Sequence, residues 1–476
     1  MSEEKVLLIF PPSFWGHKER FAQPLGILML ATILKQEGID VIALDLSAEG
    51  WYPEKLKRFI ITGSFTHVGV TILTRVREIS YYILKMVKSI NPNTTTLAGG
   101  PHVTLMKEKI FSECSVIDIA VAGEAELKIV DIIRKPSKKF YDLNYIEDIN
   151  SLPIPDRSFI RHIKYNRLSN LWIGDSASMK WARGCPWRRC RFCSRPALDI
   201  THRRRNPDDI IKEIAIIQNE LKYKNILIID DSIQVKSKYA KEILSLKIKE
   251  GLDIPFWILT RADHMDEEGV RLMKRAGAVG FQVGLESVVP RVVDMYRKIG
   301  GDPRQWYRTL DRVFELANKY QLIVIATFII GGPTETIKEI QTTVNYCRSA
   351  KMDFVKAFPF RFAYKSDLWQ EAIQKGQLKP GQYDVFNDKS YGTTEFSAEE
   401  IFKLVLEAQY LNGSPILNPR RYLRLGRKLL KQINPLLYRN VIRSPLLIKN
   451  INNLRYHHLE KKGILYKHFE FPYKAT

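Results

Sequence analysis

The sequence predicts an α/β protein in three parts: a doubly wound parallel sheet, a partial (β/α)6 barrel, and a helical, basic C-terminal region. Short apolar runs alternate with amphipathic helical patterns over the first 130 residues, and the alternation returns after an interruption. The runs are apolar at every position, which is typical of parallel strands covered on both faces. At 476 residues, the chain also exceeds the usual length of one domain.

The first part is expected to cover residues 1–145. Its predicted strands are 5–10, 40–46, 67–73, 94–100 and 116–123, and its predicted helices are about 25–37 and 79–90. The loops after the strands include TILT, AGGPHVT and GEAE, at the carboxyl edge where open parallel sheets bind ligands. No loop fits Gly-x-Gly-x-x-Gly, so we do not expect a dinucleotide.

A linker is expected at 146–175, where Pro153 and Pro155 break the periodicity. The second part, 176–375, repeats the strand and helix alternation. Its predicted strands are 178–182, 225–230, 255–260, 279–284, 322–330 and 354–360, with helices near 207–222, 236–250, 266–276, 304–320 and 335–350. Six such units are too few for a closed eightfold barrel and indicate a partial one.

The remainder, 376–476, is predicted to be helical and basic. The formal net charge of the chain is +22, and residues 415–476 carry 14 Lys or Arg but only two acids, Glu460 and Glu470. This favours anionic partners. Because the cations alternate with Leu, Ile and Tyr, one interpretation is peripheral contact with anionic lipid. The other is a solvated basic surface over a helical cap.

Cysteine usage and the apolar runs indicate a cytoplasmic protein, with possible attachment at the inner membrane surface. Five cysteines do not suggest a disulfide framework. The start of the chain lacks the pattern of a signal peptide. The longest apolar run, residues 25–34, is ten residues long, and a membrane-spanning helix needs about 20.

Three cysteines follow the first strand of the second part, in the stretch RGCPWRRCRFCSRP. Cys185, Cys190 and Cys193 have the spacing Cys-x4-Cys-x2-Cys. They could bind zinc with His202 as fourth ligand, form a basic nucleic-acid knuckle, or hold an iron–sulfur cluster with one iron left open. The missing fourth cysteine and the position at the mouth of the barrel favour the iron–sulfur cluster.

Further motifs follow in order, each at the carboxyl end of a predicted strand: IIDDS, TRAD, GLES and IIGGPTET. With the cysteines and the basic stretch RRRNPDDIIKEI, they resemble the cobalamin-dependent radical S-adenosylmethionine (SAM) enzymes of the methyltransferase-type class. The resemblance covers about residues 5–375. The sequence departs from the family at CPWRRC, which has one residue more than the usual Cys-x3-Cys.

The resemblance implies an N-terminal cobalamin-binding domain, a [4Fe-4S] cluster on the three cysteines, and SAM on the open iron. One electron, from an external donor of the flavodoxin or ferredoxin type, would then release a 5′-deoxyadenosyl radical. The residues that it places near SAM are Phe192, Asp230, Asp231, Arg261, Glu286, Ser287, Gly331 and Gly332.

These residue types suit a sulfonium cofactor with an amino-acid tail. Arg261 offers a cation for its carboxylate, while Glu286 and Ser287 offer partners for its ribose or amine. Other readings stay open: Arg261 could form a surface ion pair, one of Asp230 and Asp231 could cap a helix, and Gly331 with Gly332 could simply make a tight turn.

For cobalamin, the resemblance places contacts at the strand ends of the first part, at Thr71, Leu73, Thr74, Gly99, Gly100, His102, Gly123 and Glu124. The Asp-x-His-x-x-Gly signature of a cobalt-ligating histidine is absent, so the lower axial ligand stays open. His102 is expected in the tail pocket or as a loop histidine without a metal role.

The function implied is methylation of an unactivated carbon in a small-molecule or lipid-like substrate, through the deoxyadenosyl radical and methylcobalamin. The alternative within the class is a radical cyclase or rearrangement enzyme without net methyl transfer. The alternative of another class is a zinc-stapled basic nucleic-acid-binding protein, which leaves the ordered strand-end motifs unexplained; we do not expect nucleic acid as the partner.

Overall fold

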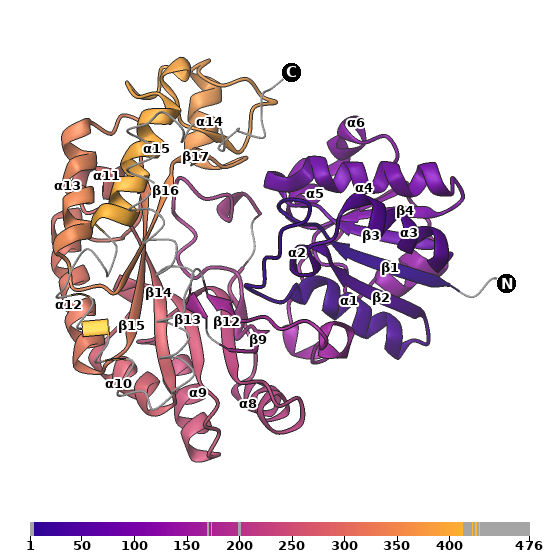
Figure 1. Cartoon of the computed structure of the whole chain (residues 1–476), viewed down its shortest axis with the longest axis horizontal. Helices are drawn as coiled ribbons and strands as arrows, with labels where there is room; N and C mark the ends of the chain where they lie inside the picture. Colours follow the sequence, from indigo (N-terminus) through magenta and orange to yellow (C-terminus); the bar gives the residue numbers. More distant parts are fainter. Residues whose placement is uncertain are drawn as a thin grey trace.

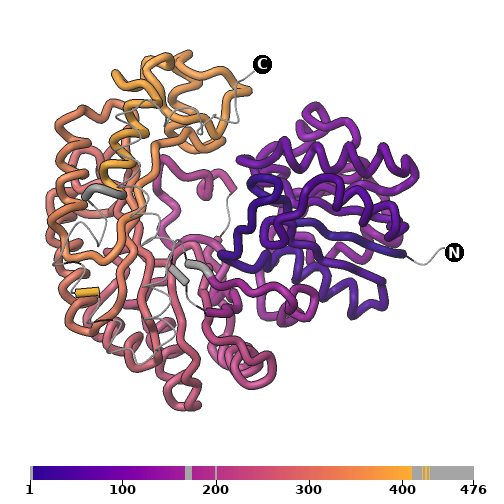
Figure 2. Tube along the Cα trace, viewed as in Figure 1, coloured from indigo at the N-terminus to yellow at the C-terminus, as the bar shows by residue number. Residues whose placement is uncertain are grey.

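The computed structural model describes residues 4–168, 171–172, 174–198 and 201–412, together with Arg421, Arg424, Leu425 and Lys428. These residues form two α/β bodies, one from the first part of the chain and one from the second (Figures 1 and 2). Each is built on a six-stranded sheet in which all neighbouring strands are parallel.

The first sheet has the strand order β2-β1-β3-β4-β5-β6. Its strands are β1 (Lys5–Phe10), β2 (Asp40–Asp45), β3 (His67–Thr71), β4 (Thr95–Gly99), β5 (Ile119–Ala122) and β6 (Phe140–Asp142). Helices α1 (Leu25–Gln36) and α7 (Ile129–Arg134) pack on one face, and α3 (Pro53–Gly63), α4 (Arg77–Ile90) and α5 (Pro101–Met106) on the other. The prediction of a doubly wound sheet is confirmed.

Strand β1 shows why the apolar runs are continuous. Val6 and Leu8 belong to the core under α1 and α7, whereas Leu7 and Ile9 belong to the core on the opposite face. All four side chains are at most 5% exposed. Because successive side chains of a strand point to opposite faces, a sheet covered on both sides needs apolar residues at every position.

The second sheet has the order β9-β12-β13-β14-β15-β16 and ends in two open edges, β9 and β16. Its strands are β9 (Ser176–Met179), β12 (Asn225–Ile233), β13 (Phe256–Arg261), β14 (Ala278–Glu286), β15 (Ile323–Ile330) and β16 (Phe354–Pro359). The helices along it are α8 (Pro207–Ala215), α9 (Lys238–Lys249), α10 (Glu267–Arg275), α11 (Pro290–Met295), α12 (Trp306–Lys319) and α13 (Ile337–Ser349). The partial barrel is therefore confirmed.

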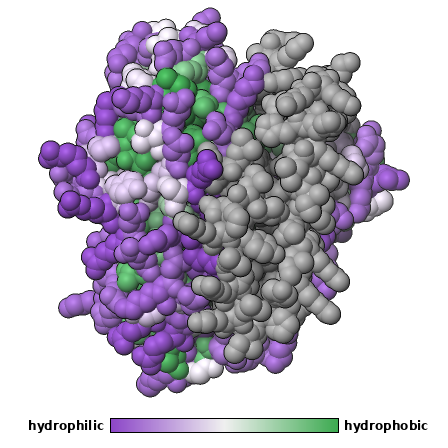
Figure 3. All heavy atoms as spheres, turned by 60° about the vertical axis from the view of Figure 1, so that its left-hand side comes forward, coloured by the Kyte–Doolittle hydropathy of each residue, from purple (hydrophilic) through white to green (hydrophobic). Residues whose placement is uncertain are grey.

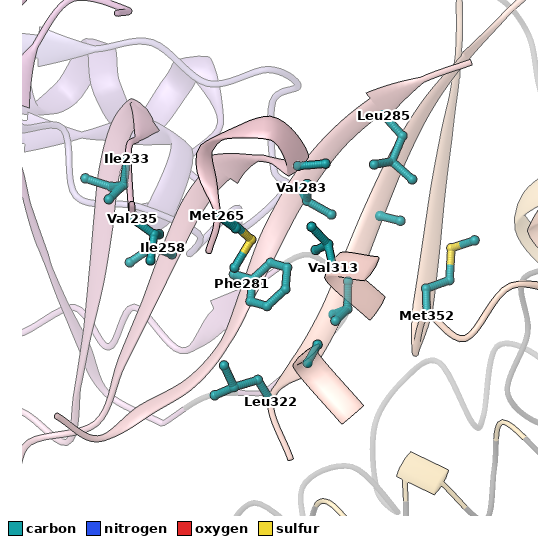
Figure 4. Packing of buried hydrophobic residues seen from close by; sticks show 14 of the residues in the cluster. Ile233, Val235, Ile258, Met265, Phe281, Val283, Leu285, Val313, Leu322 and Met352 are labelled. Carbon is teal, nitrogen blue, oxygen red and sulfur yellow. The ribbon is translucent and has the colours of Figure 1, made fainter. Parts of the chain in front are cut away.

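The two faces of this sheet differ. One face packs against the helices, in a core that includes Phe281, Val283 and Leu285 of β14 (Figure 4). The helices carry polar residues outward, and most of the coloured residues in Figure 3 are hydrophilic, with apolar patches among them. The opposite face, which we call the inner face, carries a smaller apolar cluster that includes Trp257 and Phe354.

The C-terminal region is not helical throughout. Short strands β17 (Arg361–Phe362) and β18 (Val385–Phe386) pair antiparallel, and they enclose α14 (Asp367–Gln374). Helix α15 (Ala398–Leu406) then packs on the second sheet. The expectation of a helical pattern from residue 376 thus holds for α15 but not for β18, whose short strand form depends on its distant partner β17.

Most of the basic segment 415–476 lies outside the described residues, and so does its interpretation as a lipid-contacting surface. Three of its cations are described. Arg421 donates to the carbonyls of Cys347 and Ala350, at the end of α13. Arg424 donates to the carbonyl of Met352, and Lys428 pairs with Asp353 at 2.6 Å. These cations therefore hold the turn between α13 and β16.

Among the described residues, no helix is both long enough and apolar enough to cross a bilayer.

Candidate active site

The three clustered cysteines lie in a loop between β10 (Ala182–Arg183) and β11 (Arg203–Arg204), which pair antiparallel at its base. We call residues 184–198 the cysteine loop. Cys185, Cys190 and Cys193 are half-buried and form no disulfide. Burial, with a smaller contribution from the neighbouring thiols, raises the pKa of Cys190 and raises that of Cys193 to about 12. The three thiols are therefore close enough to interact electrostatically.

The zinc interpretation gains no geometric support. Within the described part of the chain, no three His, Cys, Asp or Glu side chains form a group that could hold a single metal ion. His202 instead lines a small hollow with Trp181, Arg204 and Tyr239.

The extra residue of CPWRRC is accommodated by a left-handed backbone at Arg188, with φ of +50°. The indole Nε1 of the preceding Trp187 donates to the carbonyl of Arg297 (2.9 Å). Its ring lies against Gly300, where a Cβ would come within 2.8 Å of it. The insertion thus turns the loop toward the segment after α11.

Arg261, at the end of β13, lies beside the cysteine loop. Its Nη1 is 3.7 Å from Cys190 Sγ, and its guanidinium is 4.7 Å from the centre of the Trp187 ring. Its Nε and Nη2 bind the Asp263 carboxylate at 3.0 and 2.8 Å, and Nη2 also donates to the carbonyl of Lys298. The ion pair considered for Arg261 is therefore present, but it is largely buried.

Glu286, at the end of β14, pairs with Lys298 (Oε1 to Nζ, 2.7 Å). The pair lies over Gly284, because a Cβ at Gly284 would be 2.6 Å from Glu286 Oε1 and 3.1 Å from Lys298 Nζ. Glu286 has φ of +65°. A non-glycine residue in that conformation costs of order 1–3 kcal/mol and is frequent at functional sites.

The two aspartates of IIDDS have different environments. Asp230 accepts hydrogen bonds from the backbone N–H groups of Trp181 and Ala182 (2.8 and 2.9 Å), so it fixes the strand that leads into the cysteine loop. Burial raises its pKa to about 7. Asp231 pairs with Arg195 (2.7 Å), and its Oδ2 is buried without a hydrogen-bond partner among the described residues. Neither caps a helix.

Two of the predicted SAM contacts are engaged with the protein itself. Ser287 is fully buried and shares a hydrogen bond with Thr343 (3.1 Å). Phe192 packs edge-on against Tyr296, with ring centres 5.1 Å apart. The hydroxyl of Tyr296 is buried and has no hydrogen-bond partner in the described chain.

The turn after β15 is closed by a residue of its own motif. The backbone N–H groups of Gly331 and Gly332 both donate to Glu335 Oε2, at 3.0 and 2.9 Å. Burial raises the pKa of Glu335 to about 7. A Cβ at Gly332 would lie 2.2 Å from the Tyr296 hydroxyl. Gly331 and Gly332 therefore make a tight turn, and Gly332 also allows the close approach of the Tyr296 hydroxyl.

The glycines at the carboxyl edge of the first sheet fall into two kinds. Gly100 (φ +97°) and Gly123 (φ +86°) are required by the chain itself, since a Cβ would lie 3.1 Å from Ile72 O and 1.9 Å from Leu143 O, respectively. At Gly99, a Cβ would meet only Val121 O, at 3.8 Å. Gly99 therefore leaves open room at this edge.

His102 is fully buried and belongs to an internal network. Its Nδ1 is 3.1 Å from Thr74 Oγ1, and its Nε2 is 3.3 Å from Glu113 Oε2. Tyr383, from the segment after the barrel, also donates to Glu113 and packs against the His102 ring. Both ring nitrogens are thus within hydrogen-bond distance of groups of the protein itself.

The remaining cobalamin candidates also lie at this edge. Thr71 and Leu73 are half-buried at and after the end of β3. Glu124 follows β5 and binds two arginines of the second part, Arg183 (3.0 Å) and Arg203 (2.7 and 2.8 Å). Since Arg183 and Arg203 form the base of the cysteine loop, this carboxylate joins the edge of the first sheet to the loop.

Part of the predicted site is thus brought together at one junction. Asp231 and Arg261 contact the cysteine loop, and Glu124 joins the edge of the first sheet to its base, whereas Ser287 is buried against Thr343 of α13. The sequence analysis did not predict Lys298, Tyr296 or Glu335 as site residues. Of the three, only Glu335 stands in a recognised motif, GGPTET.

The residues present fit the implied groups. Three thiols in one loop suit an iron–sulfur cluster with an open iron. The unpaired Asp231 Oδ2 offers an acceptor for an ammonium group. The room at Gly99 suits a large ring that approaches the backbone.

Comparisons with known proteins agree with this arrangement. Residues 19–133 match the family model of the B12 binding domain, and residues 179–347 match that of the radical SAM superfamily. The chain therefore combines a cobalamin-binding domain with a radical SAM domain.

Two relatives indicate the class of enzyme to which the chain is similar. The "Uncharacterized methyltransferase PH0819" of Pyrococcus horikoshii is 30% identical over 436 residues, covering 86% of this chain and 92% of that protein. The "Anaerobic magnesium-protoporphyrin IX monomethyl ester cyclase" of Rubrivivax gelatinosus is 25% identical, covering 79% of this chain and 71% of that protein.

A solved structure shares the fold. The radical SAM methyltransferase TsrM from Kitasatospora setae, with cobalamin and a [4Fe-4S] cluster bound, matches with a TM-score of 0.62 and 17% identity, over 79% of this chain and 78% of that one. The protein belongs to the cobalamin-dependent radical SAM enzymes of the methyltransferase type, and its cofactors are a [4Fe-4S] cluster, SAM and cobalamin.

Proposed function

We propose that the protein methylates an unactivated carbon of a small organic substrate at the junction between its two sheets. The observation that carries the proposal is that Glu124, at the edge of the first sheet, binds both arginines at the base of the cysteine loop. Cobalamin at the first sheet and SAM at the loop would thereby face one another. A methyl carrier and a radical source must both reach the same substrate carbon, and this arrangement meets that need.

We assign the cluster to Cys185, Cys190 and Cys193. The cluster with SAM supplies a radical, and cobalamin carries the methyl group. The thiolates would hold three irons and leave the fourth for SAM. Arg261, with Nη1 3.7 Å from Cys190 Sγ, would stabilise the negative charge of the thiolates, and its buried pairing with Asp263 fixes its orientation.

Around SAM, Asp231 Oδ2 would accept a hydrogen bond from the amine, and the Glu286–Lys298 pair would offer a carboxylate oxygen and a cation at the end of β14. Ser287 and Asp230 act through other residues, because their side chains are hydrogen-bonded within the protein.

For cobalamin, Gly99 would let the ring approach the backbone, while Gly100 and Gly123 shape the edge. His102 would keep the loop in place through Thr74 and Glu113. We place the functional divisions at 1–145, 146–175, 176–375 and 376–476. The reaction needs an external electron donor, and contact of 415–476 with anionic lipid stays a prediction.

The test is anaerobic purification of the full chain, reconstitution with iron, sulfide and cobalamin, and addition of SAM with a reductant. Iron–sulfur absorption, bound cobalamin and formation of 5′-deoxyadenosine and S-adenosylhomocysteine are expected. Absence of cluster absorption, or of both SAM-derived products under reducing conditions, would contradict the proposal.

A radical cyclase is the second candidate, because one matched relative carries that name over 79% of this chain. SAM with an isotopically labelled methyl group distinguishes the two candidates. A methyltransferase transfers the labelled methyl group to its product, whereas a cyclase leaves its product unlabelled.

A further inference from the structure

Lys356 lies on the inner face of the edge strand β16. Its neighbours Val355 and Ala357 belong to the core under the helices, and Phe354 belongs to the apolar cluster of the inner face. Because side chains alternate along a strand, Lys356 and Phe358 share the inner face with Phe354.

The amine of Lys356 makes no hydrogen bond or ion pair with any described residue. Its Nζ lies 5.7 Å from the centre of the Phe358 ring. Burial lowers the pKa of the amine, and no charged neighbour offsets this effect. The side chain is half-buried, and an amine that is partly removed from water and has no hydrogen-bond acceptor favours a ligand that supplies one.

Three other lysines that packing shields from water have partners. Lys247 donates to the carbonyls of Leu252 (2.6 Å) and Ala276 (2.8 Å), and Lys298 pairs with Glu286. Lys180, at the opposite edge of the sheet, has Asp230 and Asp231 as electrostatic partners. Lys356 differs from all three.

The register connects Lys356 with the cysteine loop. Lys356 is the direct partner of Thr327 on β15, Thr327 that of Gly284 on β14, and Gly284 that of Arg261 on β13. These residues form one row across four strands, and Arg261 at its far end lies beside Cys190. A molecule held at Lys356 therefore lies on the same face as the cysteine loop.

Two further groups lie on this face. Gln282 Oε1 is buried and makes no hydrogen bond with a described residue. Phe358 is 46% exposed, next to Lys356 on the same face. An exposed aromatic ring beside an unpaired amine suits an organic anion, because the ring offers apolar contact that a bare inorganic ion cannot use.

We propose that Lys356 binds the anionic group, a carboxylate or a phosphate, of the organic substrate, whose apolar part lies against Phe358. The assignment rests on the proposed function for the location of the reaction. It adds the substrate class: an organic anion with an apolar or aromatic portion.

The first experiment uses the reconstituted full chain and reductive methylation with formaldehyde and a borane, read at each lysine by mass spectrometry. The probes are phenyl phosphate, hexanoate, inorganic phosphate and S-adenosylhomocysteine. We expect Lys356 to be methylated without a probe and protected by phenyl phosphate or hexanoate at lower concentration than by inorganic phosphate. No methylation, or no protection by either organic anion, overturns the proposal. Protection by S-adenosylhomocysteine alone also overturns it, because the amine would then serve SAM.

The second experiment uses variants and calorimetry. Lys356→Met should weaken binding of the protecting probe about 10- to 100-fold, the range expected for a hydrogen bond to a charged group. Its melting temperature should not fall, because Met replaces an unpaired amine with an apolar side chain of similar length. Lys247→Met is the matched control: it should lower the melting temperature and leave probe binding unchanged. Equal probe affinity in Lys356→Met and wild type would contradict the proposal.

Phe358→Ser should remove the preference for phenyl phosphate over inorganic phosphate, and an unchanged preference would overturn the role of the ring. Failure of the proposed function is recognised separately. Cluster absorption and 5′-deoxyadenosine formation in the Lys356→Met protein test the radical SAM assignment whether or not any anion binds.

Discussion

Arg183 and Arg203 face one another as direct partners in the pair β10–β11, at the base of the cysteine loop. Glu124 binds both guanidinium groups, and Glu126 binds Arg183 as well (2.7 Å). Two adjacent cations on neighbouring strands would repel each other without these acids. The acids come from the first part of the chain, so the base of the loop depends on its contact with the first sheet.

Replacing Glu124 with Ala should therefore destabilise the protein by about 3 kcal/mol, since it leaves largely buried guanidinium groups without their acceptor. Iron incorporation should fall with it. Lys107–Asp142 offers a control, because this pair is about half exposed (47% and 53%) and its removal by Asp142→Ala should cost ~1 kcal/mol or less. Chemical denaturation and iron analysis measure both effects, and equal costs would contradict the role of Glu124.

The same residue predicts a pH dependence. Burial raises the pKa of Glu124, but Arg203 and Arg183 outweigh it and lower the pKa from 4.5 to about 2. A carboxyl group whose pKa is lower in the folded than in the unfolded protein stabilises the folded state at pH values above the unfolded-state pKa. This stabilisation is lost as the pH falls from about 5 toward 2. About 3 kcal/mol should be lost, and Glu124→Gln should lack this part of the acid-induced loss. An identical acid profile for wild type and variant would refute it.

Asp45 predicts the opposite trend. It lies at the end of β2, is 2% exposed, and accepts a hydrogen bond from Tyr165 (2.6 Å). Burial raises its pKa from 3.8 to about 6. Ionisation of the folded protein is then costly, so stability should fall as the pH rises from about 4 through 6. Asp45→Asn should be more stable than wild type at pH 8 by up to about 3 kcal/mol, measured by urea unfolding. A variant less stable than wild type at that pH would show the charge to be favourable.

The cluster assignment predicts that single Ala replacements of Cys185, Cys190 or Cys193 abolish iron–sulfur absorption and lower the iron content to background. Cys114→Ala is the control, because Cys114 is buried in the core of the first part and does not belong to the loop. Retention of full cluster content by any of the three loop variants would remove that cysteine from the ligand set.

The inserted residue predicts that glycine substitutions at two neighbouring arginines differ in their effect on stability. Arg188 has a positive φ, whereas Arg189 does not. Arg188→Gly relieves a strain of about 1 kcal/mol, while Arg189→Gly only adds backbone freedom to the unfolded chain and costs about 0.5–1 kcal/mol. Thermal unfolding should therefore show Arg188→Gly to be the more stable of the two, with the cluster retained. The reverse order would mean that the left-handed turn is not what accommodates the extra residue.

Substitutions at two glycines of the first sheet should affect cobalamin binding and folding separately. Gly99→Val should leave the melting temperature nearly unchanged, since its Cβ meets only an ordinary contact and a β-branched residue suits a strand. It should lose cobalamin on gel filtration, because the room at the edge is filled. Gly123→Ala should instead destabilise the fold by at least about 2 kcal/mol, since its Cβ collides with Leu143 O at a positive φ. Full cobalamin retention by Gly99→Val would place the cofactor elsewhere.

The strands could be predicted from the sequence wherever both faces of a sheet are covered, because burial then requires apolar residues throughout. Strand β6 escaped prediction since Phe140 and Tyr141 are only half-buried and Asp142 is exposed. Helix α3 escaped it because only Leu56 and Ile60 of its eleven residues are buried. In both, tertiary contacts supply what local pattern does not.

At the candidate site, order and position of the motifs could be predicted, but not the partners. Asp230 binds backbone groups 48 and 49 residues away, on the strand before the cysteine loop. Lys298 reaches Glu286 from a loop with no periodic pattern. Such pairings depend on how the strands are ordered in the sheet, which a motif does not encode.

The cations at Arg421, Arg424 and Lys428 bear on how the protein can be shortened for study. They stand inside the basic segment that looks removable, yet they bind the carbonyls and the aspartate at the turn from α13 into β16. A chain cut before residue 421 would leave Asp353 buried without its lysine, beside the strand that carries Lys356. Any truncated form used for crystals or for lipid-binding assays should therefore keep Lys428 and begin its deletion after it.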